Sequence, residues 1–396
     1  MEHRDLQDRV SRYVDASRDA MLAFWKDLVN TESGSLDKPS VDAAAEKIVL
    51  ELESFGVEAE TIQWERAGNG ITGVLGKGRP GAPVALLGHF DTVFPKGTAS
   101  ERPFRMENGR AYGPGVLDMK GGIAVLVFAA KALEASGYRK RPLRFILAGD
   151  EETGHGNSGM GKIFEERARG CAAAFNCETG DPENRILVAR KGSMHCEMRV
   201  KGLAVHAGKE PQKGRSAILE IARKIVDIHA LTDFERGLTF NVGTVGGGVA
   251  PNAVPDSATA GIDARFLNGV QMSEAKRKLE EIAARTYVDG TSTGLEFCSC
   301  LFPMERTQGN ERLFRLVRET SLEMGLPEPS MDISGGASDS AYSVLAGVPT
   351  VDAMGVTGEW NHSSREYALA DSLFERTKLL ASCILRMDRF QNWNCP

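Results

Sequence analysis

Residues 120–137 have the sequence KGGIAVLVFAAKALEASG, and a helix of this composition is apolar around most of its girth. Such a helix must be buried on several sides, as happens inside a layered α/β fold. The segment that follows, PLRFILAG at 142–149, is a short apolar run typical of a buried strand. These two segments predict a buried sheet packed against a helix at the centre of the first half of the chain.

Short apolar runs and helical segments alternate around this centre. ITGVLG at 71–76, PVALLG at 83–88 and CAAAFNCE at 171–178 have the length and composition of strands. A helix is predicted between the last two, over SGMGKIFEERA at 158–168, and the first 30 residues have the spacing of one amphipathic helix. Strands that alternate with helices predict an α/β fold, with a mixed, mainly parallel sheet and helices on both faces.

The pattern changes near residue 190. Residues 191–305 contain strand and helix patterns in the order β-α-β-β-α-β, which is typical of a small ferredoxin-like α+β domain. The α/β pattern resumes at 306–396, with helices expected at 310–324 and 370–388. We therefore predict a domain of residues 191–305 inserted into a larger domain formed by 1–190 and 306–396.

The composition limits the possible partners. The formal net charge is −6, whereas a nucleic-acid-binding protein usually carries a basic surplus or a basic stripe. No segment approaches the roughly 20 apolar residues of a membrane span, and the charged N-terminal segment lacks the apolar core of a secretory signal. The seven cysteines are scattered without a C-x2-C pair, which favours free thiols in a reducing cytoplasm over a disulfide framework or a zinc ribbon.

His89 and Asp91 lie directly after the strand at 83–88, in GHFDTVFPKG. A histidine that binds a metal usually donates its other ring N–H to a carboxylate or a carbonyl, and a His-x-Asp pair supplies both groups. A hydrogen-bonded loop histidine is the alternative explanation of this motif.

Further acids and one histidine follow other predicted strands or turns. Asp118 follows a Gly-Pro-Gly turn, where a helix N-cap is the alternative role. Glu151 and Glu152 follow the strand at 142–149, and adjacent side chains in an extended segment point in opposite directions, so the two cannot do the same job. Glu178 ends the strand at 171–178, and His362 follows a late strand, PTVDAM.

Ligands bind at the carboxyl ends of the strands in open α/β sheets, so these residues are expected at one edge. Carboxylates combined with imidazoles suit zinc, with manganese or cobalt as substitutes. Asp118, Glu152 and Glu178, together with one hydroxide, would balance the charge of two divalent ions. The pattern therefore predicts a site for two divalent metal ions.

In these motifs the sequence resembles the M20 metallopeptidases, and most closely their glutamate carboxypeptidase (carboxypeptidase G2-like) branch. The resemblance covers nearly the whole chain and is carried, in order, by GHFDTVFPKG, AYGPGVLDMKGG, GDEETG, NCETGD, VHAG, GGASDSAYS and NHSSREY. It implies a zinc-peptidase-like catalytic domain with an inserted lid and dimerisation domain, and hence a homodimer. It also implies that His89 and Glu178 hold one zinc ion, that Glu152 and His362 hold the other, and that Asp118 bridges the two.

The resemblance assigns roles to other residues as well. It implies that Asp91 orients His89, that Glu151 is the general base, and that the Asp118–Met119 peptide bond is cis. From the inserted domain, His206 and Asn252 would reach the reacting carbonyl. The list of implied substrate contacts is completed by Arg265, as the clamp on a substrate carboxylate, and by Gly335 and Gly336, as pocket lining.

The expected function is metal-dependent hydrolysis of an amide bond in a small molecule or short peptide with a free carboxylate. The alternatives are hydrolysis of another C–N bond on the same frame, by a deacylase, desuccinylase or aromatic amine deaminase, and a non-catalytic dimeric binding protein. Relatives selective for a C-terminal glutamate have a further basic residue where this chain has EFCSCLFPM at 296–304. Phe302 and Met304 suggest a more apolar pocket instead, and the basic residues that could substitute are Arg185, Arg190, Lys191 and Arg306.

Overall fold

The computed structural model describes residues 2–387, with side chains from residue 5 onward, so Cys395 lies outside the described residues. The chain divides into two compact units. The first unit consists of the described residues up to Ala189, the segment Arg306–Ile333, and the described residues from Ser338 onward. The second unit consists of Arg190–Glu305 and the short segment Ser334–Ala337.

The first unit is built on a six-stranded sheet with the strand order β1-β2-β6-β3-β7-β14. Strand β3 pairs in parallel with β6 and β7, and β14 pairs in parallel with β7, whereas β1 and β2 are antiparallel additions at one edge. The prediction of a mixed, mainly parallel sheet is therefore confirmed. The strands are β1 (Val57–Ile62), β2 (Gly70–Leu75), β3 (Val84–His89), β6 (Leu143–Ala148), β7 (Ala173–Asn176) and β14 (Thr350–Val351).

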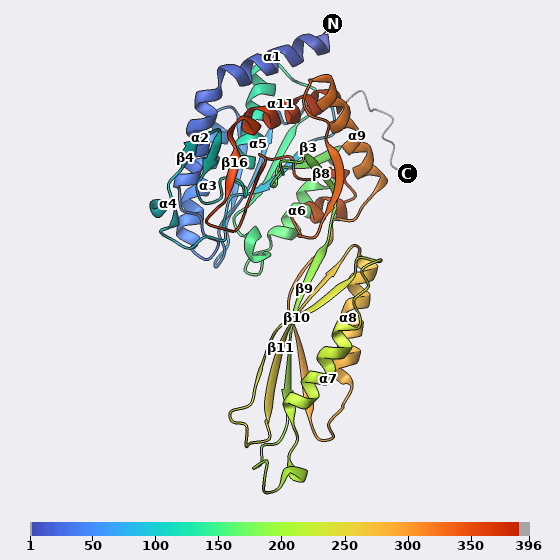
Figure 1. Cartoon of the computed structure of the whole chain (residues 1–396). Helices are drawn as coiled ribbons and strands as arrows, with labels where there is room; N and C mark the ends of the chain where they lie inside the picture. Colours follow the sequence, from blue (N-terminus) through green and yellow to red (C-terminus); the bar gives the residue numbers. More distant parts are fainter. Residues whose placement is uncertain (1, 388–396) are drawn as a thin grey trace. The chain divides into compact units, whose positions relative to one another are not determined.

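Helices cover both faces of this sheet (Figure 1). The apolar helix predicted at 120–137 is α5 (Lys120–Ala135), and its residues from Lys120 to Ala130 are all buried. Side chains alternate across β3, so Leu86 belongs to the core cluster that contains α5, while Leu87 belongs to the cluster that contains residues of α6. The remaining helices of four residues or more are α1 (Glu2–Ala16), α2 (Arg18–Asn30), α3 (Lys38–Glu53), α4 (Thr98–Glu101), α6 (Met160–Ala168), α9 (Gln308–Glu323), α10 (Ser340–Leu345) and α11 (Ala370–Arg386).

The prediction of a single N-terminal helix was wrong, because the helix is interrupted at Ser17 between α1 and α2. The Ser17 backbone has φ −99° and ψ 6°, outside the helical range. Its N–H bonds to both Tyr13 O and Val14 O, at 3.0 and 3.1 Å. Serine competes for backbone hydrogen bonds and is therefore favoured at helix ends, a signal that the amphipathic spacing obscured.

Two small sheets complete the first unit and its boundary. One has the order β15-β16-β5-β4, and the other pairs β13 with β8. Their strands are β4 (Arg105–Glu107), β5 (Arg110–Tyr112), β8 (Arg185–Arg190), β13 (Ser330–Ser334), β15 (Gly358–Glu359) and β16 (Tyr367–Leu369).

The second unit has the element order β9-α7-β10-β11-α8-β12. Its four strands form an antiparallel sheet in the order β10-β11-β9-β12, and α7 and α8 cover one face of it (Figure 1). Ser216 and Asn268 cap the two helices by accepting the N–H groups of Leu219 and Gln271. The elements are β9 (Gly192–Lys201), α7 (Ala217–His229), β10 (Thr239–Gly247), β11 (Ser257–Phe266), α8 (Gly269–Ala284) and β12 (Ser292–Leu301).

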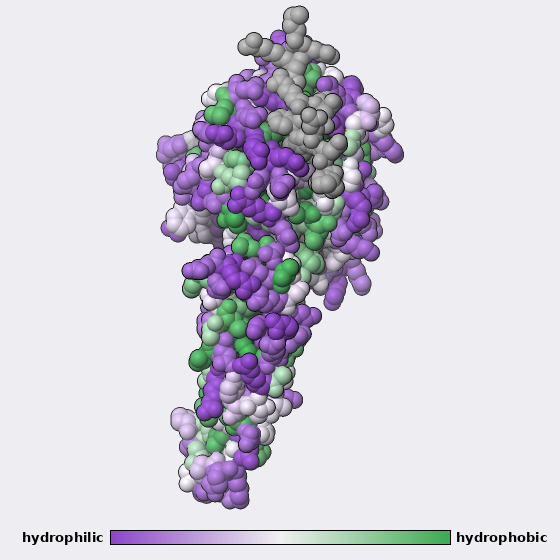
Figure 2. Space-filling model, turned by 90° about the vertical axis from the view of Figure 1, so that its right-hand side faces the viewer, coloured by the Kyte–Doolittle hydropathy of each residue, from purple (hydrophilic) through white to green (hydrophobic). Residues whose placement is uncertain are grey.

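Hydrophilic residues cover most of the face shown in Figure 2, with apolar residues scattered among them. This is the ordinary surface of a folded chain whose long apolar helix is inside. Among the helices of the described residues, none combines the length and the apolarity needed to cross a membrane.

Candidate functional site

The strands β3, β6 and β7 run in parallel, so the segments that follow them emerge at one edge of the sheet. His89 is the last residue of β3, and Glu178 lies two residues beyond the end of β7. Glu151 and Glu152 form the start of a single 3-10 turn, η1 (Glu151–Thr153), after β6. The sheet therefore brings together residues that are as far apart in the sequence as 89 and 178.

His89 is buried and is surrounded by carboxylates. Its Nε2 lies 3.2 Å from Asp118 Oδ1 and 3.4 Å from Glu178 Oε1, and its Nδ1 lies 3.3 Å from Asp91 Oδ1. Burial alone would lower the pKa of His89, but Glu178, Asp118 and Asp91 together raise that pKa well above its ordinary value. Each ring nitrogen thus faces negative charge.

His362 reaches the opposite side of Asp118. Its Nε2 lies 3.1 Å from Asp118 Oδ2 and 3.1 Å from Glu152 Oε2, and these two contacts raise the pKa of His362 to about 11. The His362 backbone has φ 59°, an uncommon value for a residue with a side chain. Asp118 therefore presents one oxygen to His89 and the other to His362.

Asp91 is fully buried and fixes the turn that carries the two glutamates. Its Oδ1 accepts the N–H of Glu151 and its Oδ2 accepts the N–H of Glu152, both at 3.2 Å. Ser35 Oγ donates to Oδ2 as well, at 2.7 Å. One carboxylate therefore contacts the imidazole of His89 and positions the backbone of the adjacent acids.

The two glutamates of the turn face different neighbours. Glu151 offers an oxygen within 4.8 Å of ligand atoms of His89 and Glu178, and Glu152 does the same with His89 and Asp118. Burial raises the pKa of Glu152 to about 7 and that of Glu151 well above its ordinary value. Neighbouring acids add to both shifts, because the charge of Glu178 also raises the pKa of Glu151 and the charge of Asp118 also raises that of Glu152.

The environment of one carboxylate oxygen shows whether these residues could bind a metal ion. Glu152 Oε1 is buried and has no hydrogen-bond partner among the described residues. A buried carboxylate oxygen without a partner is costly, and a bound divalent cation would supply the missing partner. The donor set of imidazole nitrogens and carboxylate oxygens suits zinc and similar ions, so the residues fit the predicted metals.

Sequence reasoning missed two residues in the loop that carries His362. Asn361 Nδ2 donates to Asp118 Oδ2 at 3.0 Å. Glu366 is buried and accepts the N–H groups of Gly115, Leu117 and Asp118 at 2.9–3.0 Å, so it holds the turn that presents Asp118. Burial raises the pKa of Glu366 to about 7. The only sequence signal was their position beside His362.

Two further features lie beside the cluster: the peptide bond after Asp118 and the contacts of His155. The Asp118–Met119 peptide bond is cis, as the resemblance implied. The His155 imidazole lies between two buried carboxylates, with its Nδ1 2.9 Å from Asp150 Oδ1 and its Nε2 2.6 Å from Asp339 Oδ1. Asp150 thus belongs to a buried structural contact beside the cluster.

Five predicted substrate residues lie in the second unit. His206 and Asn252 are brought close together, because His206 bridges with Ala253 and the Ala207 N–H donates to Asn252 O at 2.9 Å. Arg265 is engaged with Asp263, whose two oxygens each lie 2.8 Å from its Nε. The list is completed by Gly335 and Gly336, which are both exposed.

Two of the residues suggested for a second substrate carboxylate are paired with acids of the chain. Arg185 is paired with Asp181 and Asp332, and Arg306 Nε donates to Glu311 at 2.6 Å. The suggestion that Met304 lines a pocket was wrong, because this side chain is 1% exposed.

Known proteins are similar to this one over most of the chain. The profile of the family described as "Peptidase family M20/M25/M40" matches residues 85–386. Carboxypeptidase G2 of Pseudomonas sp. strain RS-16 is 28% identical, with 92% of this chain and 89% of that protein covered. Succinyl-diaminopimelate desuccinylase of Xanthobacter autotrophicus is 29% identical, with 88% and 95% covered.

Solved structures share the fold. One of them is the Bacillus subtilis YXEP protein, described as a dinuclear metal binding peptidase from the M20 family, with a TM-score of 0.66. The two chains are 17% identical, and the match covers 94% of this chain and 98% of that one.

Proposed function

The chain belongs to peptidase family M20/M25/M40, and from this membership we propose that it hydrolyses an amide bond next to a free carboxylate, using two divalent metal ions. It is a hydrolase, and its substrate class is a short peptide or an N-acyl amino acid. The observation that carries the proposal is the cluster of two imidazoles and four carboxylates at the sheet edge, in which Glu152 keeps a buried oxygen without a partner.

We assign His89 and Glu178 to one ion, Glu152 and His362 to the other, and Asp118 to both. The distances support the assignment, because Asp118 directs one oxygen to each imidazole. Zinc is our first choice, with manganese or cobalt as substitutes. When bound, such ions lower the pKa of water and polarise the carbonyl of the substrate.

Glu151 is proposed as the general base. It takes a proton from the attacking water and delivers that proton to the leaving nitrogen. Burial raises the pKa of Glu151, and a raised pKa makes a carboxylate a stronger proton acceptor. Asp91 positions it, since the Glu151 N–H is held by the Asp91 carboxylate.

The second unit is proposed to supply the remaining contacts. His206 and Asn252, which lie close together, would contact the oxygen of the reacting carbonyl, and Arg265 would bind the substrate carboxylate. We also propose that Gly335 and Gly336 line the substrate pocket. The Asp263 contact keeps the Arg265 guanidinium oriented before substrate arrives.

The activities named for two relatives support this range of substrates. One relative is a carboxypeptidase and the other removes a succinyl group from an amino acid, so both act at an amide bond. A desuccinylase activity is therefore the second candidate function. The description of the Bacillus subtilis protein as dinuclear supports the choice of two ions.

Two further proposals concern the cell and the assembly. We propose a cytoplasmic protein, because the six cysteines of the described residues are all free thiols, as a reducing compartment favours. We also propose a homodimer formed through the second unit, whose strands β10 and β12 are open edges within the chain.

The test combines metal analysis with a substrate panel of dipeptides and N-acyl amino acids. We expect about two divalent ions per chain after reconstitution with zinc, and hydrolysis of at least one panel compound. The matching carboxyl amides should be poor substrates. A chain that binds fewer than one ion, or a loaded chain that cleaves no amide, would refute the proposal.

A further inference from the structure

His155 is a buried histidine that the proposed reaction does not use. It lies two residues after the turn η1, and it is 8% exposed. Its ring packs against two aromatic rings, with centroid distances of 6.3 Å to Phe164 of α6 and 5.8 Å to Tyr342 of α10. A polar ring in such an apolar setting needs hydrogen-bond partners to offset its loss of water. The partners of its two nitrogens therefore indicate its role.

Each nitrogen of the ring contacts a different carboxylate. Nδ1 lies 2.9 Å from Asp150 Oδ1, and Nε2 lies 2.6 Å from Asp339 Oδ1. Ionised carboxylates only accept hydrogen bonds, so a ring that donates to both must carry a proton on each nitrogen. Burial alone would lower the pKa of His155, but Asp339 and Asp150 raise that pKa well above its ordinary value. The ring is therefore an imidazolium that donates to both acids.

Both carboxylates depend on this imidazolium. Asp150 is 1% exposed and Asp339 is 3% exposed, and each makes its ion pair with His155. The Oδ2 atom of each is buried without a hydrogen-bond partner among the described residues. Without the ring, two buried carboxylates would be left unpaired, which is costly. The three side chains therefore form one unit, which we call the His155 bridge.

The turn that contains Glu151 closes on Asp150, at one end of the bridge. The Asp150 backbone oxygen accepts the N–H groups of Thr153 and His155, both at 3.3 Å, and the Thr153 hydroxyl at 3.0 Å. The Gly154 N–H donates to Glu151 O at 2.7 Å. Because these bonds link the turn to Asp150, a displacement of Asp150 would move both glutamates with it.

Asp339, at the other end of the bridge, lies on a fixed part of the first unit. It directly precedes α10, whose first residue, Ser340, donates from Oγ to Asp352 Oδ2 at 2.6 Å. Asn176, the last residue of β7, donates from Nδ2 to Ser340 Oγ at 2.9 Å. The His155 ring therefore ties the turn to a helix that is itself bound to the central sheet.

Asp91 holds the same turn from a second side, because its carboxylate accepts the N–H groups of both glutamates at 3.2 Å. That contact does not involve Asp150, so the two anchors are independent of each other. Two anchors define the position of a turn more closely than one. A displacement of about 1 Å at a reacting group can lower a rate by about 10²-fold, so the second anchor matters for catalysis.

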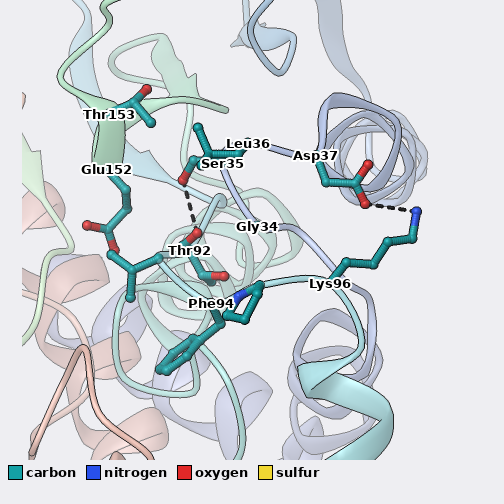
Figure 3. Close-up of a pocket in the computed structure, with 11 residues that line it drawn as sticks. Gly34, Ser35, Leu36, Asp37, Thr92, Phe94, Lys96, Glu152 and Thr153 are labelled. Atoms are coloured by element: carbon teal, nitrogen blue, oxygen red, sulfur yellow. Dashed lines mark hydrogen bonds and ion pairs between the residues drawn. The ribbon is translucent and has the colours of Figure 1, made fainter.

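The turn also borders a pocket of about 400 Å³ beside the metal cluster (Figure 3). Glu152 and Thr153 lie on one side of it, and the rest of its lining comes from residues 34–37 and 92–96, which a backbone bridge joins. A shift of the turn would therefore change both the metal cluster and the space next to it.

From these contacts we propose that His155 is a positioning residue, which joins Asp150 to Asp339 and thereby fixes the turn of Glu151 and Glu152. The inference rests on the proposed function, because it uses the roles proposed there for the two glutamates. The bridge keeps Glu151 placed to take a proton from water, and it keeps the Glu152 carboxylate directed at one metal ion.

The main test is Asp339→Leu, which removes the far end of the bridge. His155 and Asp150 stay paired in this variant, so no unpaired carboxylate is created. With the zinc-loaded full chain and the substrate cleaved fastest in the panel, we expect kcat to fall by about 10–100-fold while KM stays within about twofold of wild type. Wild-type kcat would overturn the proposal. If this variant does not fold, His155→Gln replaces it, because the glutamine amide nitrogen takes the place of only one ring nitrogen.

A conservative variant distinguishes the bridge from the charge of Asp339. In Asp339→Asn the amide oxygen can still accept the Nε2–H of His155, so kcat should stay within about threefold of wild type. Asp371→Leu is the matched control, since the Asp371 side chain is 82% exposed on α11. An asparagine variant as slow as the leucine variant would assign the effect to the charge and overturn the positioning role.

Zinc affinity tests the same role without turnover. Glu152 binds only one of the two ions in the proposed assignment. Asp339→Leu should therefore weaken one zinc ion by about 10–100-fold in competition with a chelator, and leave the other unchanged. Equal weakening of both ions would show a general loss of structure and overturn the proposal.

Hydrogen exchange of the full chain as purified separates this proposal from the proposed function. Peptides covering residues 149–156 should exchange faster in Asp339→Leu and in His155→Gln, whereas peptides of α5 should be unchanged. Faster exchange confined to the turn supports the bridge even if the wild-type chain cleaves no amide, an outcome that would refute only the proposed function. Unchanged exchange in the turn, or faster exchange throughout the first unit in both variants, would overturn the bridge even if amides are cleaved.

Discussion

The first and second units both bury charged side chains, but the acids around His89 and His362 in the first unit outnumber the basic groups beside them, whereas one buried acid of the second unit is matched by a buried lysine. In the second unit, Glu220 and Lys224 are both fully buried, with Lys224 Nζ 3.1 Å from Glu220 Oε1. Lys224 also donates to the carbonyl oxygens of Ile282 and Ala283, at 2.8 and 3.1 Å. Glu220 Oε2 accepts the N–H groups at the start of the segment after α8, from Tyr287 and Val288.

The buried acids of the first unit are arranged differently. Asp118, Glu151, Glu152 and Glu178 gather around two imidazoles, and Glu152 keeps an oxygen without a partner. A buried charge that the chain itself neutralises has a structural role, because the fold alone explains it. Buried charges that the chain leaves in excess indicate a ligand of opposite sign.

The largest effect should come from changing one acid of the cluster without changing its shape. Glu151→Gln should lower kcat by about 10²–10⁴-fold while zinc content stays at the wild-type level, since the amide cannot take a proton from water. Steady-state kinetics and metal analysis on the same sample measure both. The exposed Glu166→Gln on α6 is the control. Near-normal turnover in Glu151→Gln would assign the base role elsewhere.

Changing one member of the Glu220–Lys224 pair in the second unit should lower the stability of the fold. Lys224→Met leaves Glu220 charged and buried, which should cost about 3–5 kcal/mol of unfolding free energy. Hydrogen exchange in peptides covering α7 measures the loss. Lys278→Met is the control, because Lys278 is partly exposed.

A double variant decides whether this loss comes from charge imbalance. Glu220→Leu combined with Lys224→Met removes both charges, so it should recover much of the stability lost in the single variant. If the double variant is less stable than Lys224→Met, the pair does more than balance charge, and the contrast between the units fails.

Glu366 is an intermediate case, a buried acid of the first unit balanced by three backbone N–H groups. In Glu366→Gln, the amide group can no longer accept all three bonds, so the turn that presents Asp118 should loosen. Loss of such a supporting contact typically lowers metal affinity by about 10–100-fold. Competition with a zinc chelator measures this affinity, and an affinity equal to wild type would limit Glu366 to a general structural role.

The smallest effect concerns the pH dependence of stability without metal. The pKa values of Glu152 and Glu366, both raised to about 7 by burial, mean that the folded chain keeps protons that an unfolded chain releases near 4.5. Stability of the metal-free first unit should therefore fall as pH rises from about 4.5 to 7. In the second unit, a hydrogen bond from Arg236 lowers the pKa of Glu274. The stability that this hydrogen bond contributes is therefore present above pH 4.5 and is lost at lower pH.

Tryptophan fluorescence can follow this prediction. Trp25, Trp64 and Trp360 all belong to the first unit. The urea concentration at the unfolding midpoint of the metal-free chain should decrease as the pH is raised from 5 to 7. Added zinc should make this midpoint less dependent on pH. A midpoint that rises over this interval would contradict the excess of buried acid.

The sequence was sufficient for the features that follow from local pattern. The sheet and α5 were predictable because their apolar runs are long and are interrupted by polar turns. His89, Glu151, Glu152 and Glu178 were found because each follows such a run and parallel strands end at one edge. The metal role of these side chains stays a prediction, but the structure brings their ligand atoms together.

Features that depend on distant backbone contacts could not be predicted. Glu366 acts on amides some 250 positions earlier in the chain, and no spacing in the sequence reveals that pairing. The pocket depends on the bridge between Gly34 and Thr92, two residues in ordinary-looking loops. Met304 was misassigned because an apolar residue near a site gives no indication of whether it faces a ligand or the core.

The wide separation of the cluster in the sequence has a consequence for synthesis. His89, Asp118, Glu152 and Glu178 leave the ribosome well before His362, which lies near the end of the chain, in the loop that also carries Glu366. Until that loop emerges, the nascent protein has an acidic sheet edge with a single imidazole and an unsupported Asp118 turn. A chain that stopped before His362 would therefore lack the second imidazole of the cluster and, on our proposed assignment, should bind fewer metal ions than the chain that includes it.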